Sequence, residues 1–212
     1  MPVKAEREYR SMPVMEIRAA AEEAEEAQEE SYIVEGYATT FNSPYVLFRV
    51  DGVDYKEQID RHAFDNTDMS DVILQYDHEG RVYARQSNGT LQLSIDDHGL
   101  KVRANLGLTS GSRDLYEEIR SGLIKDMSFA FVIADDGDEY DEKEHMRTVK
   151  SIRKLYDTSV VSIPANPGTE ISARSWCGGV AEREQQELLA RADRERRARI
   201  LRIKLEATNG NR

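Results

Sequence analysis

The sequence has few of the residues that form disulfides or metal sites. Its 212 residues include one cysteine, Cys177, and four histidines. A single cysteine forms neither an internal disulfide nor a cysteine-based zinc site, so we expect a chain from a reducing compartment. No spaced set of His, Asp and Glu ligands and no phosphate-binding glycine loop is evident. We therefore expect no metal and no organic cofactor.

Long apolar runs and an excess of basic charge are also missing. No run of apolar residues approaches the length of a membrane span, and the N-terminus lacks the pattern of a secretory signal. The formal net charge is -11, which disfavours a general nucleic-acid binder because such a protein needs a basic surface. We expect a soluble intracellular protein that binds neither membrane nor nucleic acid.

The composition, 39% hydrophobic and 33% charged, suits one folded domain between charged tails. Residues 1–31 include the stretch EIRAAAEEAEEAQEE, in which like charges crowd and no wide apolar stripe exists. We expect these residues to form a solvated tail or helix. The domain is predicted to span residues 32–174. A linker and a charged C-terminal helix are predicted over residues 175–212.

A hairpin and a helix are predicted in the middle of the chain. Apolar residues alternate from Thr90 to Leu106 on both sides of the turn Asp96-Asp97-His98-Gly99, which is typical of two paired strands. The following sequence SRDLYEEIRSG predicts a helix with Ser112 as its N-cap and Gly122 at its end.

Two further strands are predicted towards the end of the domain, over residues 127–134 and 147–163. The acidic residues 135–144 between them lack the ligand spacing of a calcium loop and are predicted to form a solvated hairpin tip. Several short strands with one or two helices favour a β-rich α+β fold. We expect an antiparallel β-barrel with peripheral helices, flanked by charged helical or disordered tails.

Ser128 lies where a strand could present a nucleophile. In residues 127–134 alternate side chains point to opposite faces of the sheet, so Met127 and Phe129 share an apolar face while Ser128 lies on the smaller one. A hydroxyl on a rigid strand is well placed for catalysis. Taken alone, the pattern is more often that of a small polar residue without a catalytic role.

A serine nucleophile needs a base, and histidine is the usual one. His98 and His145 are predicted loop residues, and His62 lies in the sequence DRHAF. His78 differs because it follows the apolar run VILQYD, where an ordered element meets a loop. His78 is therefore the candidate base.

Asp157 is the candidate for a third, acidic member. It lies in the apolar sequence LYDTSVVSI, where an ionised carboxylate needs a partner. A histidine N–H would be such a partner, and the carboxylate would hold that histidine in the required tautomer. A salt bridge to Arg153 or another cation, or exposure on an edge strand, would account for Asp157 equally well.

Short sequence segments across residues 32–174 occur in the order found in the prohead proteases of tailed bacteriophages. The segments are VEGYA at 34–38 with FN at 41–42, EQI at 57–59 with AF at 63–64, YDH at 76–78, GLKV at 99–102, IRSG at 119–122, MSFAF at 127–131 and SVVSIPA at 159–165. The chain resembles this family, which is thought to share its fold with the herpesvirus assemblin proteases.

The resemblance implies a serine endopeptidase with Ser128 as nucleophile, His78 as base and Asp157 as the acidic member. Its implied substrates are a scaffold protein or a scaffold-like extension of the major capsid protein, and also the enzyme itself. It would act inside the assembling prohead in the host cytoplasm, without a cofactor. The analogy with the herpesvirus enzymes admits a homodimer.

Three residues depart from the family pattern. Asp157 stands where glutamate is common, and its shorter side chain requires His78 or the strand to lie closer. Ala130 and His62 stand where glycine is common. The alternative functions are a non-catalytic capsid-assembly or scaffolding module and a fusion of protease and scaffold, in which residues 181–212 belong to the scaffold. A metallohydrolase is disfavoured by the lack of a ligand set.

Overall fold

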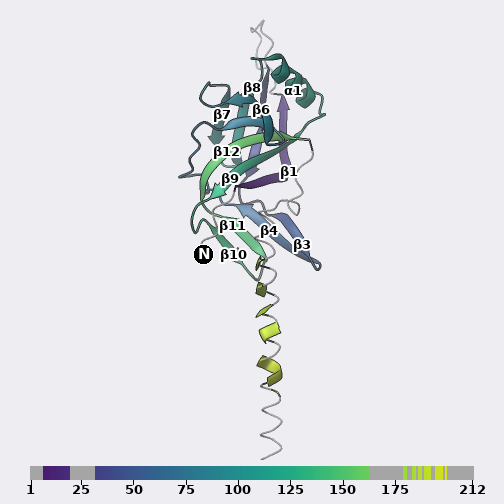
Figure 1. Ribbon diagram of the computed structural model, residues 1–212, viewed down its shortest axis with the longest axis vertical. Helices are drawn as coiled ribbons and strands as arrows, with labels where there is room; N and C mark the ends of the chain where they lie inside the picture. Colours follow the sequence, from purple (N-terminus) through teal and green to yellow (C-terminus); the bar gives the residue numbers. More distant parts are fainter. Residues whose placement is uncertain are drawn as a thin grey trace, which may run out of the picture. The chain divides into compact units, whose positions relative to one another are not determined.

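The computed structural model describes residues 7–19 and 32–162, together with the positions 179, 180, 183, 184, 186, 187, 189–191, 194–197 and 199. The chain divides into two compact units, Met1–Ala173 and Arg174–Arg212. All described residues of the second unit are helical (Figure 1). Within the described part of the chain, no helix is both long enough and apolar enough to cross a membrane.

The described residues of the first unit form twelve strands and one helix. In chain order they are β1 (Glu8–Ala19), β2 (Ile33–Thr40), β3 (Tyr45–Val50), β4 (Val53–Ile59), β5 (Ile73–Tyr76), β6 (Glu79–Arg85), β7 (Leu91–Ile95), β8 (Gly99–Asn105), α1 (Ser110–Arg120), β9 (Asp126–Ile133), β10 (Asp138–Asp141), β11 (Met146–Val149) and β12 (Ile152–Val161).

These strands form three sheets, two of which share β1. The strand orders are β6-β5-β12-β9-β1, β1-β2-β8-β7 and β10-β11-β4-β3. The N-terminal part of β1 pairs with β9, and its residues 17–19 pair with β2. Two pairs are parallel, β11 with β4 and β12 with β5.

The predicted antiparallel barrel is wrong. None of the described sheets closes, because the end strands β6 and β7 of the eight-strand series do not pair with each other. Alternating apolar residues indicate which segments are strands, but they do not specify which strands become neighbours. That choice depends on packing between segments far apart in the sequence, and here it includes the two parallel pairs.

The N-terminal segment also differs from expectation. Residues 8–19, which we expected in a tail or helix, form β1, and the side chains of Arg10 and Ile17 are buried. Residues 20–31 of that expected tail lie outside the described residues. Backbone pairing with β9 and β2, the burial of Ile17 in the core and the polar contacts of Arg10 hold β1 in the sheet.

Several local predictions agree with the structure, with small shifts at their ends. The hairpin forms as β7 and β8, and the strand over 127–134 forms as β9. The helix begins earlier than predicted: Thr109 is its N-cap, and the Thr109 hydroxyl accepts a hydrogen bond from the Ser112 backbone N–H. The expected acidic loop tip contains β10, which pairs with β11.

The hydrophobic core lies around β9, which pairs with β12 on one side and β1 on the other (Figure 1). Both faces of this strand are buried, because it is an interior strand covered by other elements. Met127, Phe129 and Phe131 are fully buried, as the alternating pattern predicts. Ser128 therefore projects from one of the most enclosed strands of the unit.

A core substitution on β5 should test this packing. We expect Leu74→Ala, at a fully buried position, to lower the free energy of unfolding by about 2–5 kcal/mol because it removes apolar contacts and leaves a cavity. The matched control is Leu123→Ala, at a residue that is 75% exposed. This substitution should change the free energy of unfolding by less than about 0.5 kcal/mol. Urea unfolding monitored by circular dichroism measures both. Equal effects would contradict the assigned core.

Candidate active site

Three residues from separate elements form one hydrogen-bonded chain. Ser128 lies on β9, Asp157 on β12, and His78 in the turn between β5 and β6. The His78 Nδ1 atom lies 2.6 Å from Asp157 Oδ1, and His78 Nε2 lies 2.5 Å from Ser128 Oγ. The structure thus brings together the three residues named from the sequence.

A β-bulge in β12 puts Asp157 on the same face as Ser128. The pairing of β12 with β9 shifts between Leu155 and Asp157, so that Asp157 lies opposite Ala130 and Ser159 lies opposite Ser128. Regular pairing from Leu155, which lies opposite Phe131, would put Asp157 opposite Phe129. Asp157 would then point to the other face of the sheet, away from Ser128.

The turn that carries His78 is held against the end of β12. Asp77 and His78 both have positive φ, 48° and 58°, in the left-handed region that non-glycine residues seldom adopt. The Asp77 carboxylate accepts hydrogen bonds of 3.0 Å from the backbone N–H and from the hydroxyl of Ser162. These bonds offset the strain and fix the direction of the His78 ring.

Asp157 is buried, with 2% of its surface exposed, and its Oδ1 atom also accepts a hydrogen bond of 2.9 Å from the Ser159 hydroxyl. Its charge partner is His78, not Arg153. Strand β12 lies between β9 and β5, so Asp157 is not on an edge strand. Of the arrangements that the sequence left open for Asp157, the one in the structure is the contact with a histidine ring nitrogen.

Strand β1 covers the Ser128 end of the hydrogen-bonded series Ser128–His78–Asp157. Ser128 is fully buried, and its hydroxyl lies within 3.0 Å of the backbone carbonyl oxygen of Arg10. The ring of Tyr9 packs edge-on against His78, with 4.7 Å between ring centroids. A hydroxyl has one hydrogen, so Ser128 donates either to His78 Nε2 or to the Arg10 carbonyl at any moment.

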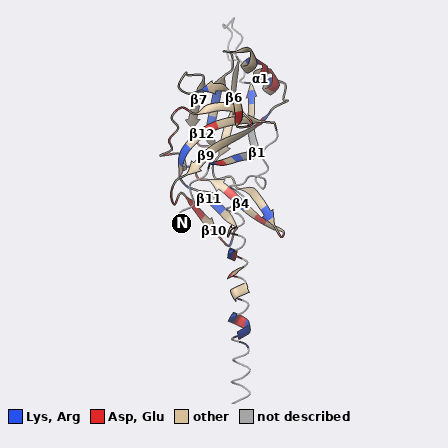
Figure 2. Ribbon diagram, viewed as in Figure 1, with Lys and Arg blue, Asp and Glu red and all other residues tan. Residues whose placement is uncertain are grey.

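The Arg10 side chain enters a buried cluster of charges that joins β1 to β4 and β11. Its Nε lies 2.5 Å from Glu57 Oε1, and its Nη2 lies 3.1 Å from Glu57 Oε2. The Nη1 atom of Arg147 lies 3.1 Å from Glu57 and 3.0 Å from Glu8. Arg147 Nε also bonds Asp138 at 2.6 Å. The basic and acidic positions of β11 and β4 lie close together in Figure 2.

Glu57 is ionised within this cluster although no part of it is exposed. Burial alone would raise the pKa of its carboxyl group, but the charges of Arg10 and Arg147 outweigh burial and lower that pKa from 4.5 to about 2. The Tyr45 hydroxyl donates a further hydrogen bond to Glu57. Burial and the Glu57 charge raise the pKa of Tyr45, which keeps that hydroxyl protonated.

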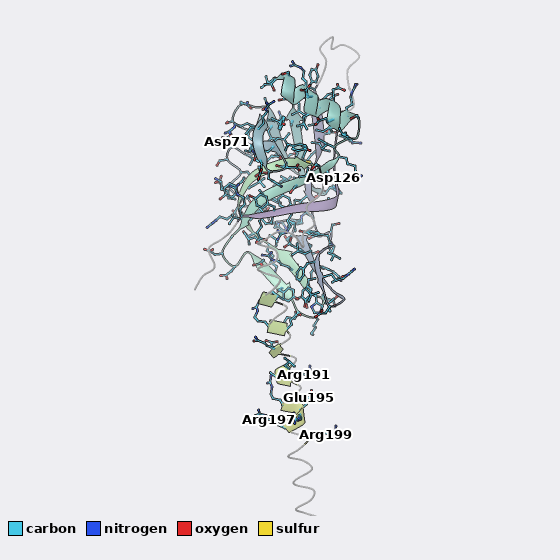
Figure 3. All side chains as sticks on the ribbon, turned by 45° about the vertical axis from the view of Figure 1, so that its right-hand side comes forward. Asp71, Asp126, Arg191, Glu195, Arg197 and Arg199 are labelled. Atoms are coloured by element: carbon cyan, nitrogen blue, oxygen red, sulfur yellow. The ribbon has the colours of Figure 1, made fainter. Side chains whose placement is uncertain are left out.

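The remaining histidines have other partners. His62 pairs with Asp65 at the surface, His98 packs against Tyr37, and His145 lies within 3.2 Å of the Tyr140 hydroxyl. Among the residues that the structure describes, no group of three or more His, Cys, Asp or Glu side chains is arranged to hold a metal ion. In Figure 3 the label of Asp126 marks the start of β9, two residues before Ser128.

The sequence did not single out Tyr9, Arg10, Glu57 or Ser159 as site residues. Ser159 was within reach of a sequence argument, because it follows Asp157 by two positions and shares its strand face. Glu57 was noted only as part of the segment EQI, without any role in the site. Residues 8–11 carry no apolar alternation, so no local signal indicates that Tyr9 and Arg10 pack against the site.

Comparison with known protein families gives a match over most of the chain. The sequence model of the family described as Caudovirus prohead serine protease matches residues 18–182. No curated protein and no solved structure matches the chain. The matched span contains Ser128, His78 and Asp157.

The charge cluster leads to a prediction about stability and pH. The folded-state pKa of Glu57 lies below its ordinary value. The contribution of the Glu57 charge to the free energy of unfolding is therefore present above about pH 4.5 and is lost as pH falls towards 2. We expect Glu57→Gln to lower the free energy of unfolding by about 3 kcal/mol at pH 7, and this difference should shrink below pH 4.5.

Urea unfolding of both proteins between pH 7 and pH 3 measures the difference. The matched control is Glu139→Gln, which removes an exposed carboxylate paired with Lys150 and should cost less than about 1 kcal/mol at any pH. A pH-independent penalty for Glu57→Gln would show that the Glu57 charge is not what stabilises the cluster.

Proposed function

Because the chain belongs to the family of Caudovirus prohead serine proteases, we propose that it is a serine endopeptidase in which Ser128, His78 and Asp157 act as nucleophile, base and acid. The observation that carries this proposal is the continuous hydrogen-bonded chain of the three side chains, with contacts of 2.5 Å and 2.6 Å. A nucleophile, a base in contact with it, and a carboxylate that orients the base are the groups that acyl transfer needs.

The proposed reaction begins with transfer of the Ser128 hydroxyl proton to His78 Nε2. The Ser128 oxygen attacks the scissile carbonyl carbon, and the resulting oxyanion requires hydrogen-bond donors. His78 then gives its proton to the leaving amine, which breaks the C–N bond and leaves an acyl ester on Ser128. Water, deprotonated by His78, hydrolyses that ester and restores the serine.

Asp157 would hold the His78 Nδ1–H and stabilise the imidazolium that forms during each step. The fully buried Ser159 hydroxyl, which bonds the same Oδ1 atom as His78, would keep the Asp157 carboxylate in place. The contact of 2.6 Å supports this role for an aspartate at a position where glutamate is common in the family. The bulge in β12 puts this shorter side chain on the face of the sheet that carries Ser128, where it reaches the ring.

The family acts in capsid maturation, and we propose that this enzyme cleaves the scaffold protein or a scaffold-like extension of the major capsid protein inside the assembling prohead. Its own terminal segments are further proposed substrates, since charged chain outside a folded core is readily cleaved. No metal or cofactor takes part in the proposed reaction.

Co-expression with the capsid and scaffold proteins of its phage tests the proposed function. We expect the wild-type chain to trim these partners or its own termini, and Ser128→Ala and His78→Ala to leave all of them intact, as read by intact mass. The matched controls are the exposed residues Ser94 and His62, whose alanine variants should cleave like wild type. If the wild-type chain and every variant leave all masses uncut while shells still assemble, the result would favour the capsid-assembly module.

Replacement of the carboxylate tests Asp157 separately. We expect Asp157→Asn to reduce the cleavage rate by about 10³- to 10⁴-fold, because an amide does not stabilise the imidazolium and favours the wrong tautomer of His78. The control Asp135→Asn, at an exposed position, should leave the rate unchanged. The rate of scaffold cleavage by the purified protein is the measurement, and an undiminished rate in Asp157→Asn would remove Asp157 from the site.

A further inference from the structure

Residues 8–11 of β1 lie along β9 as an added edge strand. The register pairs Glu8 with Phe131, Arg10 with Phe129 and Ser11 with Ser128. The pairing of β1 with β2 begins only at residue 17, so residues 8–11 bond to β9 alone. Extended peptides bind to exposed sheet edges in the same manner, with backbone hydrogen bonds to one strand.

The register places one particular carbonyl group at the nucleophile. The carbonyl oxygen of Arg10 accepts a hydrogen bond of 3.0 Å from Ser128 Oγ. The Arg10–Ser11 peptide group therefore lies beside the hydroxyl that would attack a carbonyl carbon in acyl transfer. Ser128 is fully buried. A separate peptide therefore has no access to the Ser128 hydroxyl until residues 8–11 leave β9.

The side chain of Arg10 points to the other face of β9. Arg10 lies opposite Phe129 in the ladder, its guanidinium is 5.6 Å from the Phe131 ring, and it bonds Glu57 through two nitrogen atoms. The partners that remain when residues 8–11 leave are the carboxylates of Glu57 and Asp138 and the guanidinium of Arg147. Glu8 leaves together with Arg10, so the net charge of the cluster does not change. Glu57, however, loses its two bonds to the Arg10 guanidinium and keeps Arg147 as a cationic partner.

A buried carboxylate that loses one of its cationic partners is destabilised. A side chain that takes the place of Arg10 should therefore carry a positive charge and reach Glu57 with two donors. The planar guanidinium of arginine meets this requirement better than the single ammonium group of lysine. An amide or apolar side chain leaves Glu57 partly unpaired.

We propose that residues 8–11 occupy the substrate-binding strand position of the enzyme, and that its substrates are extended peptides with arginine immediately before the scissile bond, selected by Glu57. This inference rests on the proposed function, because it assigns Ser128 as the nucleophile. In this arrangement Arg10 stands where the arginine of a substrate would stand, and the chain is latent until its own strand is displaced.

Labelling of Ser128 by a fluorophosphonate probe, followed by intact mass, tests the occupancy of the site. We expect Arg10→Met to be labelled at least ten times faster than wild type, because the strand loses its bonds to Glu57. The matched control Arg18→Met replaces an arginine of the same strand that is 79% exposed, and it should be labelled at the wild-type rate.

Tyr9→Ala provides a second variant in case Arg10→Met does not fold. It leaves the charge cluster intact but removes the ring that packs on His78, and it should also speed labelling. Equal labelling rates in wild type and in the folded variants would overturn the proposal while the proposed function stands. If no folded chain is labelled and none shows His78-dependent cleavage, the proposed function itself fails.

Peptide cleavage tests the arginine preference. The probes are the hexapeptide EYRSMP, which is residues 8–13 of the chain, and the same peptide with glutamine in place of arginine. With the Arg10→Met or Tyr9→Ala protein we expect the arginine peptide to be cut at least ten times faster, after the arginine. The further substitution Glu57→Gln should reduce that ratio towards one. Equal rates for the two peptides would overturn the assignment of Glu57.

Discussion

The one-residue bulge in β12 determines whether the candidate site exists. Side chains alternate between the faces of a sheet, so a change of register by one residue moves every later side chain to the opposite face. Before the bulge, Leu155 lies opposite Phe131, and after it Ser159 lies opposite Ser128. Asp157 is thereby on the Ser128 face, and the parallel pairing of Val160 with Tyr76 sets where β5 ends and the His78 turn begins. The positions of all three side chains depend on this register.

Ser128 and Glu57 are buried at opposite faces of β9, and Arg10 of β1 contacts both of them. On one face the Arg10 carbonyl contacts Ser128, and on the other the Arg10 guanidinium bonds Glu57. Buried charges are tolerated where they are paired and hydrogen-bonded, and in this cluster Arg147 and Tyr45 supply the further bonds to Glu57. The charge cluster therefore positions the backbone that covers the nucleophile.

The sequence was sufficient for several local elements and for naming three candidate residues that the structure brings together, but not for the arrangement of the strands that carry them. Alternation revealed β9 and the β7–β8 hairpin, because one apolar face is a local property. The parallel pairing of β12 with β5 and the open sheets were missed, because pairing between distant strands leaves no local pattern. The role of Arg10 was missed for the same reason, since its partner Glu57 lies 47 positions further along the chain.

The contact between Ser128 and Arg10 joins residues 118 positions apart, and this separation has a consequence for synthesis of the chain. Residues 8–11 leave the ribosome long before β9, and β12 follows later still. Closing so long a loop is slow compared with forming local structure. Ser128, His78 and Asp157 can meet only when nearly the whole first unit has been translated, so a nascent chain carries no assembled candidate site that could act on neighbouring proteins.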